Sequence, residues 1–171
     1  MNIPSRSSPT VLAGMFFFTV LPRAVLIALV PLEALSLLGS PRSVSVLFLV
    51  ASAFGVAGSL SIPALMRRIG TAGIFHLAAA SACVASVLLY QSTVGWFLIG
   101  MVLWAYSAVA FEVSMNLYVL HRIPQSQITR FEPRRILFAV VSYSIGPWLG
   151  VYLSNHVADW APLIVAIVAS V

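Results

Sequence analysis

The sequence has no lysine, four acidic residues and one cysteine, Cys83, among 171 residues. With a single cysteine the chain can form no intramolecular disulfide and no thiolate metal cluster, so Cys83 is interpreted as a small buried residue. Charged residues make up 8% and hydrophobic residues 61%, and the mean hydropathy is +1.05. Soluble domains carry about 25% charged residues. These values exclude an ordinary soluble domain and predict a membrane protein.

The sequence also lacks the common signatures of catalysis. It contains no G-x-S-x-G, no H-E-x-x-H, no phosphate-binding glycine loop and no pair of aspartates within an apolar run. We therefore expect no enzyme, no cofactor and no metal site. The net charge of +5 would suggest nucleic acid as a partner of a soluble protein. Here the positions of the arginines favour a lipid bilayer instead, and no nucleic-acid partner is expected.

The apolar runs are continuous rather than alternating, which predicts helices and not a barrel. A hydrocarbon core of about 30 Å needs about 20 helical residues. The sequence therefore predicts an all-α, polytopic membrane protein with a single transmembrane domain over residues 1–171. Its six spans are expected near residues 11–34, 44–65, 72–90, 94–120, 136–154 and 160–171.

Polar and turn-forming residues mark the breaks between these spans. The breaks are Gly39–Pro41, Arg67–Gly70, Gln91–Thr93, a loop over residues 121–135, and Asn155–Asp159. Glu132 and Pro133 are expected to begin the fifth helix. A secretory signal peptide over Arg6 and residues 11–21 is a competing interpretation, but Pro22-Arg23-Ala24 is not a small-x-small cleavage site.

The arginines follow the positive-inside rule if the amino terminus is cytoplasmic. Arg42 alone, with Asp159 opposing it, then lies outside. The inside set is Arg6, Arg67, Arg68, Arg122, Arg130, Arg134 and Arg135. This pattern predicts a multi-pass protein with its 121–135 loop in the cytoplasm, and the use of arginine without lysine is typical of a GC-rich bacterial genome. The expected location is the bacterial cytoplasmic (inner) membrane.

Two segments carry a resemblance to a known family. "PALMRRIGTA", from Pro63, resembles the loop G-x-x-x-D-R-x-G-R-R between helices two and three of the major facilitator superfamily. Arg68 and Gly70 match that pattern, whereas Arg67 stands at the aspartate position. "SYSIGPWLGVYL" is similar to the glycine-proline motif of helix five in the same superfamily, through Ser142, Gly146, Pro147 and Gly150.

The spacing of four between residues 142, 146 and 150 places small side chains on one helix face, where a neighbouring backbone can approach closely. Simple tight packing is one interpretation of that face. The resemblance implies another, because in antiporters of the superfamily this motif lies near the interface that opens and closes.

Halves of the superfamily are built from inverted three-helix repeats, so helix two should resemble helix five. "LFLVAS" at residues 47–52 and "LFAVVS" at 137–142 share four residues in register. The resemblance implies the amino-terminal six-helix half of a transporter. A second six-helix half is then expected as a partner, in the same chain or as a dimer.

Ionisable residues within the spans are the candidates for function, because a charge at a helix centre costs about 2.5–3.5 kcal/mol. Arg23 and Glu112 are expected to face the central cavity, with Asn116 beside Glu112 and with Ala105 and Ala108 keeping the face narrow. Arg23 would hold an anionic group of a small solute or neutralise Glu112, and Glu112 could carry a proton. A structural ion pair between two helices is the alternative.

Two functions from different classes remain open at the level of sequence. The first is a secondary transporter that moves a small solute by alternating access. The second is a non-transporting membrane scaffold or an inactive transporter remnant, in which the motifs serve only packing. Glu33 is interpreted as an interfacial residue rather than a gate, and Trp104, which lies deeper than the other tryptophans, is a candidate wall of the cavity.

Overall fold

A computed structural model describes residues 9–91, 93–122 and 125–170. The regular elements of this part of the chain are all helices, which confirms the all-α prediction at that level. They are α1 (Pro9–Leu26), α2 (Leu29–Leu38), α3 (Pro41–Ser59), α4 (Ile62–Leu89), α5 (Val94–Arg122), α6 (Gln125–His156) and α7 (Ala161–Ser170).

Five helical segments are long and apolar enough to cross a membrane, as expected of a polytopic membrane protein. The first combines α1 and α2, and α3, α4, α5 and α6 supply the other four. The sixth predicted span corresponds to α7, which has only 10 residues within the described chain and is shorter than a crossing requires.

Prolines explain where the first two spans are interrupted. α1 ends at Leu26, and α2 begins at Leu29. Pro31 has no N–H to donate to the carbonyl of Ile27, four residues earlier, and its ring crowds that carbonyl. Pro63 has the same relation to Ser59, where α3 ends. In both places two residues separate the helices, since α2 begins at Leu29 and α4 begins at Ile62.

The predicted break at Arg67–Gly70 lies inside α4, because the chain turns earlier, at Leu60–Ser61. Residues 62–69 form a short helical segment, and Gly70 then redirects the chain with φ 71° and ψ 176°. This backbone conformation is essentially restricted to glycine. The sequence therefore located the glycine of the turn but not the helix that precedes it.

The predicted loop over residues 121–135 is helical wherever the structure describes it. α5 continues to Arg122, α6 begins at Gln125, and Pro133 lies within α6 instead of opening it. Phe131, which is 1% exposed, packs among Phe16 and Val119. Tertiary burial of this aromatic ring thus keeps a locally polar segment helical.

The other predicted breaks coincide with helix ends. Gly39 caps α2 with φ 64°, and its N–H donates to the carbonyl of Leu35. α4 gives way to α5 between Leu89 and Val94, and α6 gives way to α7 between His156 and Ala161.

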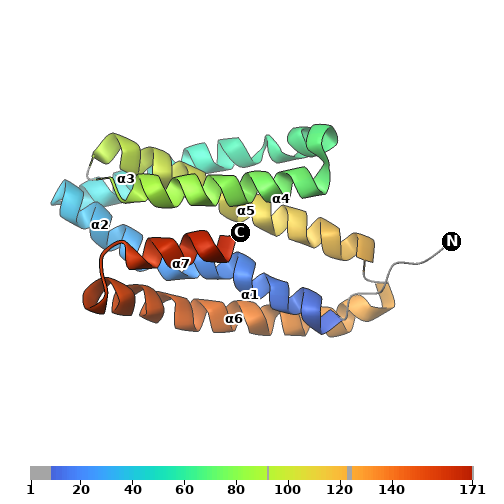
Figure 1. Cartoon of the computed structure of the whole chain (residues 1–171). Helices are drawn as coiled ribbons and strands as arrows, with labels where there is room; N and C mark the ends of the chain where they lie inside the picture. Colours follow the sequence, from blue (N-terminus) through green and yellow to red (C-terminus); the bar gives the residue numbers. More distant parts are fainter. Residues whose placement is uncertain (1–8, 92, 123–124, 171) are drawn as a thin grey trace.

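The helices lie side by side in two groups (Figure 1). α1 packs against α6 and α7, α5 packs against α4 and α3, and α4 contacts α7 between the groups. The start of α4, the end of α5 and the start of α6 lie at one end of the bundle (Figure 1). This end carries Arg67, Arg68, Arg122, Arg130, Arg134 and Arg135, whereas Arg6 lies outside the described residues.

Candidate functional site

A pocket of about 330 Å³ lies between α1, α5 and α6. α1 contributes Phe16, Thr19, Val20 and Arg23, and α5 contributes Ala108, Phe111 and Glu112. The α6 wall consists of Arg135, Ile136, Ala139, Val140 and Tyr143. The pocket is thus largely apolar, with charged groups on all three walls.

Arg23 and Glu112 both line this pocket, from α1 and from α5. Protein covers neither side chain fully, since both are exposed. Within the described residues, neither has a hydrogen-bond or ion-pair partner. The structural ion pair considered for these two residues is therefore not formed in this conformation, and two charges of opposite sign face one cavity.

Asn116 follows Glu112 by one helical turn but does not line the pocket. Its Oδ1 accepts a hydrogen bond of 2.8 Å from Nη1 of Arg135. Ala108 lines the pocket as expected. Ala105 instead faces Gly55 of α3, where a methyl group on the glycine would lie 2.9 Å from the alanine Cβ. The residues predicted to share one face of α5 are thus divided. Glu112 and Ala108 line the pocket, whereas Asn116 contacts α6 and Ala105 contacts α3.

Arg135 was predicted as a residue of topology only, yet it lines the pocket. Its guanidinium forms an ion pair with Glu132, hydrogen-bonds Asn116, and lies 5.1 Å from the ring centroid of Phe16. Its Nε is buried and has no hydrogen-bond partner in the described chain. One side chain thereby joins α1, α5 and α6 at one end of the pocket. The signal in the sequence was the i, i+3 pair of Glu132 and Arg135 at the head of a span.

The small residues of α6 hold its backbone against α1. Ser142 is buried and donates from Oγ to the carbonyl of Phe17 over 3.0 Å. A methyl group on Gly146 would lie 2.5 Å from Cβ of Ala24, and one on Gly150 would overlap the carbonyl oxygen of Val25. Pro147 follows Gly146 inside the same helix. The motif therefore fixes the α1–α6 wall at backbone contact, as its spacing of four allows.

The other arginines of the predicted set whose side chains are described, Arg67, Arg68 and Arg134, do not line the pocket. Arg67 and Arg68 are exposed on the short helical segment before Gly70. Arg134 is exposed on α6 and engages a partner. The side chains of Arg122 and Arg130 lie outside the described part of the structure, although their backbones belong to α5 and α6.

Trp104 lies beside Arg23 rather than in the main pocket. Both residues border a small space of about 10 Å³ between α1, α4 and α5, together with Ser86 and Ser107. The Trp104 Nε1–H is buried and lacks a hydrogen-bond acceptor in the described chain. Trp104 therefore borders this small space together with Arg23 and is not part of the lining of the main pocket.

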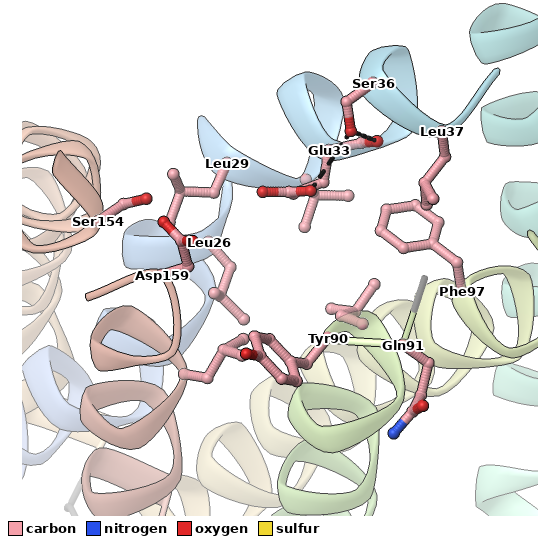
Figure 2. A pocket seen from close by; sticks show the side chains of 13 residues that line it. Leu26, Leu29, Glu33, Ser36, Leu37, Tyr90, Gln91, Phe97, Ser154 and Asp159 are labelled. Atoms are coloured by element: carbon pink, nitrogen blue, oxygen red, sulfur yellow. Dashed lines mark hydrogen bonds between the residues drawn. The ribbon is translucent and has the colours of Figure 1, made fainter. Parts of the chain in front are cut away.

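A second pocket, of about 350 Å³, is lined by residues of α1 and α2, of the α4–α5 connection and of the α6–α7 connection (Figure 2). Glu33 of α2 and Asp159 of the α6–α7 connection line it, and the ring of Tyr90 projects into it (Figure 2). Oγ of Ser36 donates to the backbone carbonyl of Glu33 over 2.8 Å. Charges near a helix end can be hydrated at little cost. The charges of this pocket are therefore weaker evidence for a functional site than Arg23 and Glu112, which lie within the spans.

Comparisons with protein families, curated proteins and solved structures find no match to this chain. In the described residues, no group of three histidine, cysteine, aspartate or glutamate side chains is arranged to hold a metal ion. The pocket between α1, α5 and α6 must therefore be interpreted from its own residues.

Proposed function

We propose that this chain is a secondary active transporter of a small solute, working by alternating access, and that it forms the amino-terminal half of a transporter of the major facilitator type. The observation that carries this proposal is the placement of Arg23 and Glu112 on one pocket within the spans. Ionisable residues in such segments are costly and usually mark a substrate or ion pathway. A proton is a candidate coupling ion, with Glu112 as its carrier.

The packing of the helices supports an inverted repeat. α1 packs on α6 and α7, and α5 packs on α3 and α4. Suppose that α1 (with α2) corresponds to α5, α3 to α6, and α4 to α7. The contacts of α1 with α6 and α7 then correspond to the contacts of α5 with α3 and α4. Glycine mediates a close contact in each set, between Gly146 and Ala24 in one and between Gly55 and Ala105 in the other. Two three-helix units related by a two-fold axis would produce this correspondence.

The exposed faces of α3 and α6 are where a second six-helix half would dock. These two spans are the least covered by protein, with 17% of their apolar windows buried, against 33% to 39% for the other three. The second half is supplied by the same polypeptide or by a second copy. Lipid covers the rest of the apolar surface.

The charge distribution supports the proposed orientation. Six arginines of the described segments gather at the end where α4 begins, α5 ends and α6 begins (Figure 1). Arg42 and Asp159 lie in segments at the other end. By the positive-inside rule, the arginine-rich end is cytoplasmic, and the protein belongs to a bacterial cytoplasmic membrane with its amino terminus inside.

The test is uptake from a mixture. Proteoliposomes containing the chain are incubated with an isotope-labelled extract of polar metabolites, with and without an inward proton gradient, and their contents are identified by mass spectrometry. We expect one solute or a small group of related solutes to accumulate. The variants Arg23→Gln and Glu112→Gln should reduce accumulation about 10- to 100-fold, the loss that accompanies a missing charge-assisted contact.

Matched control variants distinguish the loss of a charge in the pocket from the loss of a charge elsewhere in the protein. Arg42→Gln and Glu33→Gln make the same changes outside this pocket and should leave uptake intact. No accumulation above empty vesicles would overturn the transporter and favour a scaffold or an inactive remnant. Equal losses of uptake in the pocket variants and in the control variants would overturn the proposal that this pocket binds the solute.

A further inference from the structure

The two unpaired charges of the pocket indicate what kind of solute it accepts, if the proposed function holds. Arg23 and Glu112 lie on different helices, and each lacks a protein partner among the described residues. A bound molecule that satisfied only one of them would leave the other charge desolvated and unpaired. Such a charge is strongly destabilising, so occupancy by a molecule of a single charge is disfavoured.

The third charge in the pocket is already engaged. Arg135 is bound to Glu132 and to Asn116, and its guanidinium packs over the Phe16 ring. Its side chain is 23% exposed, which leaves little of the guanidinium for a ligand. Among the residues whose side chains the structure describes, the charged groups of the pocket left for a ligand are therefore one cation, Arg23, and one anion, Glu112.

The remaining wall fits an apolar body. Val20, Ile136 and Val140 are aliphatic, and Phe16 and Phe111 are aromatic. Thr19 and Tyr143 are the uncharged polar residues of the lining. Pockets for small molecules typically combine such apolar walls with a few polar groups that fix orientation.

We propose that the solute is a zwitterion with an apolar side chain, of the amino-acid type. Its carboxylate binds the guanidinium fork of Arg23, which suits the planar geometry of a carboxylate. Its ammonium group binds the carboxylate of Glu112. Its aliphatic or aromatic side chain lies against the apolar residues of α1 and α6. This inference rests on the proposed transport function and names the substrate class of that same pocket.

Two series of probes of matched skeleton test this proposal by calorimetry on the purified full chain. The first is leucine, 4-methylpentanoate and 3-methylbutylamine, and the second is phenylalanine, 3-phenylpropanoate and 2-phenylethylamine. Within each series the three probes present both charges, the carboxylate alone and the ammonium alone. In at least one series we expect the amino acid to bind about 10- to 100-fold more tightly than both analogues.

The variants assign each charge to its partner. With Arg23→Gln the amine should bind as well as the amino acid, and with Glu112→Gln the carboxylate should do so, because the unsatisfied protein charge has been removed. Arg42→Gln and Glu33→Gln, which lie outside this pocket, should keep the wild-type preference.

Two results would overturn the proposal: no binding in either series, or binding in which neither amino acid is held more tightly than both of its analogues. Its failure is distinguishable from that of the transporter. If the uptake assay accumulates a solute of a single charge, transport stands and the zwitterion is wrong. If the amino acid binds with the predicted preference but nothing accumulates, the binding site stands and transport is wrong.

Discussion

Nη1 of Arg135 donates a hydrogen bond to Oδ1 of Asn116 over 2.8 Å and thereby joins the start of α6 to α5. The same guanidinium is paired with Glu132 and packs over Phe16 of α1. The positive-inside pattern of the sequence explained Arg135 only as a topology residue. In the structure its side chain contacts three helices at one end of the pocket.

Removal of this side chain should loosen that end of the bundle. We expect Arg135→Leu to lower the free energy of unfolding by about 1–3 kcal/mol, because Asn116 loses its donor and Glu132 its counter-ion. Arg135→Lys should rescue only part of the loss, since an ammonium cannot reproduce the planar fork. Thermal unfolding in detergent measures the effect, with the exposed Arg67→Leu as the control. Equal stability of the Arg135 and Arg67 variants would contradict this role.

Arg23 and Glu112 should behave in the opposite way. Each is a charge within a span and has no partner in the described chain, so Arg23→Leu and Glu112→Leu should raise stability. The gain should stay below the roughly 2.5–3.5 kcal/mol that insertion scales assign to a charge at a helix centre, because both side chains are exposed to the pocket. The same variants should abolish uptake. A structural ion pair predicts the reverse, because breaking it would leave a charge uncompensated and would lower the unfolding temperature.

The backbone contact between α1 and α6 predicts a sharp size limit. Gly146→Ala and Gly150→Ala should each destabilise the fold by about 1–3 kcal/mol, because the added methyl group meets Ala24 or the Val25 carbonyl. Gly14→Ala adds the same group where no atom lies within 4 Å, and should be neutral or stabilising. The melting temperatures of the three variants test this prediction. Equal shifts at positions 14, 146 and 150 would contradict a close backbone contact between α1 and α6.

Gly70 tests the turn that the sequence located only in part. Its φ of 71° and ψ of 176° lie in a region that residues with a Cβ avoid. Gly70→Ala should cost about 1–3 kcal/mol of stability, although open space surrounds the position. Gly95→Ala, also in open space but without a positive φ, is the control. No difference between these two melting temperatures would show that the backbone conformation carries no cost.

The sequence predicted the parts of the fold that depend on local physical chemistry. Long apolar runs predicted the helices, and turn residues such as Gly39 predicted where α2 ends. Local signals failed where tertiary packing decides, as at Phe131, whose burial keeps a polar segment helical. They also failed at Pro63, whose missing N–H ends α3 several residues before the arginines.

The residues of the candidate site also differ in how far the sequence could predict them. Arg23 and Glu112 stood out because charge within an apolar run is costly, which can be recognised from sequence alone. Arg135 did not stand out, because its position at the head of a span has an ordinary explanation in topology. Its role depends on Asn116 and Phe16, which lie on other helices. Such a convergence is a property of the three-dimensional arrangement.

The most direct test of the central claim is whether water reaches the pocket from both sides of the membrane. With Cys83 replaced by alanine, Val140→Cys places a thiol in the pocket, and Val84→Cys places one on α4 away from it; the native side chains are 54% and 49% exposed. A charged, membrane-impermeant thiol reagent is applied to right-side-out and inside-out vesicles. Alternating access predicts that Val140→Cys reacts from both sides and Val84→Cys from neither. Failure of Val140→Cys to react, or equal reaction of the two thiols, would contradict a solute pathway through this pocket.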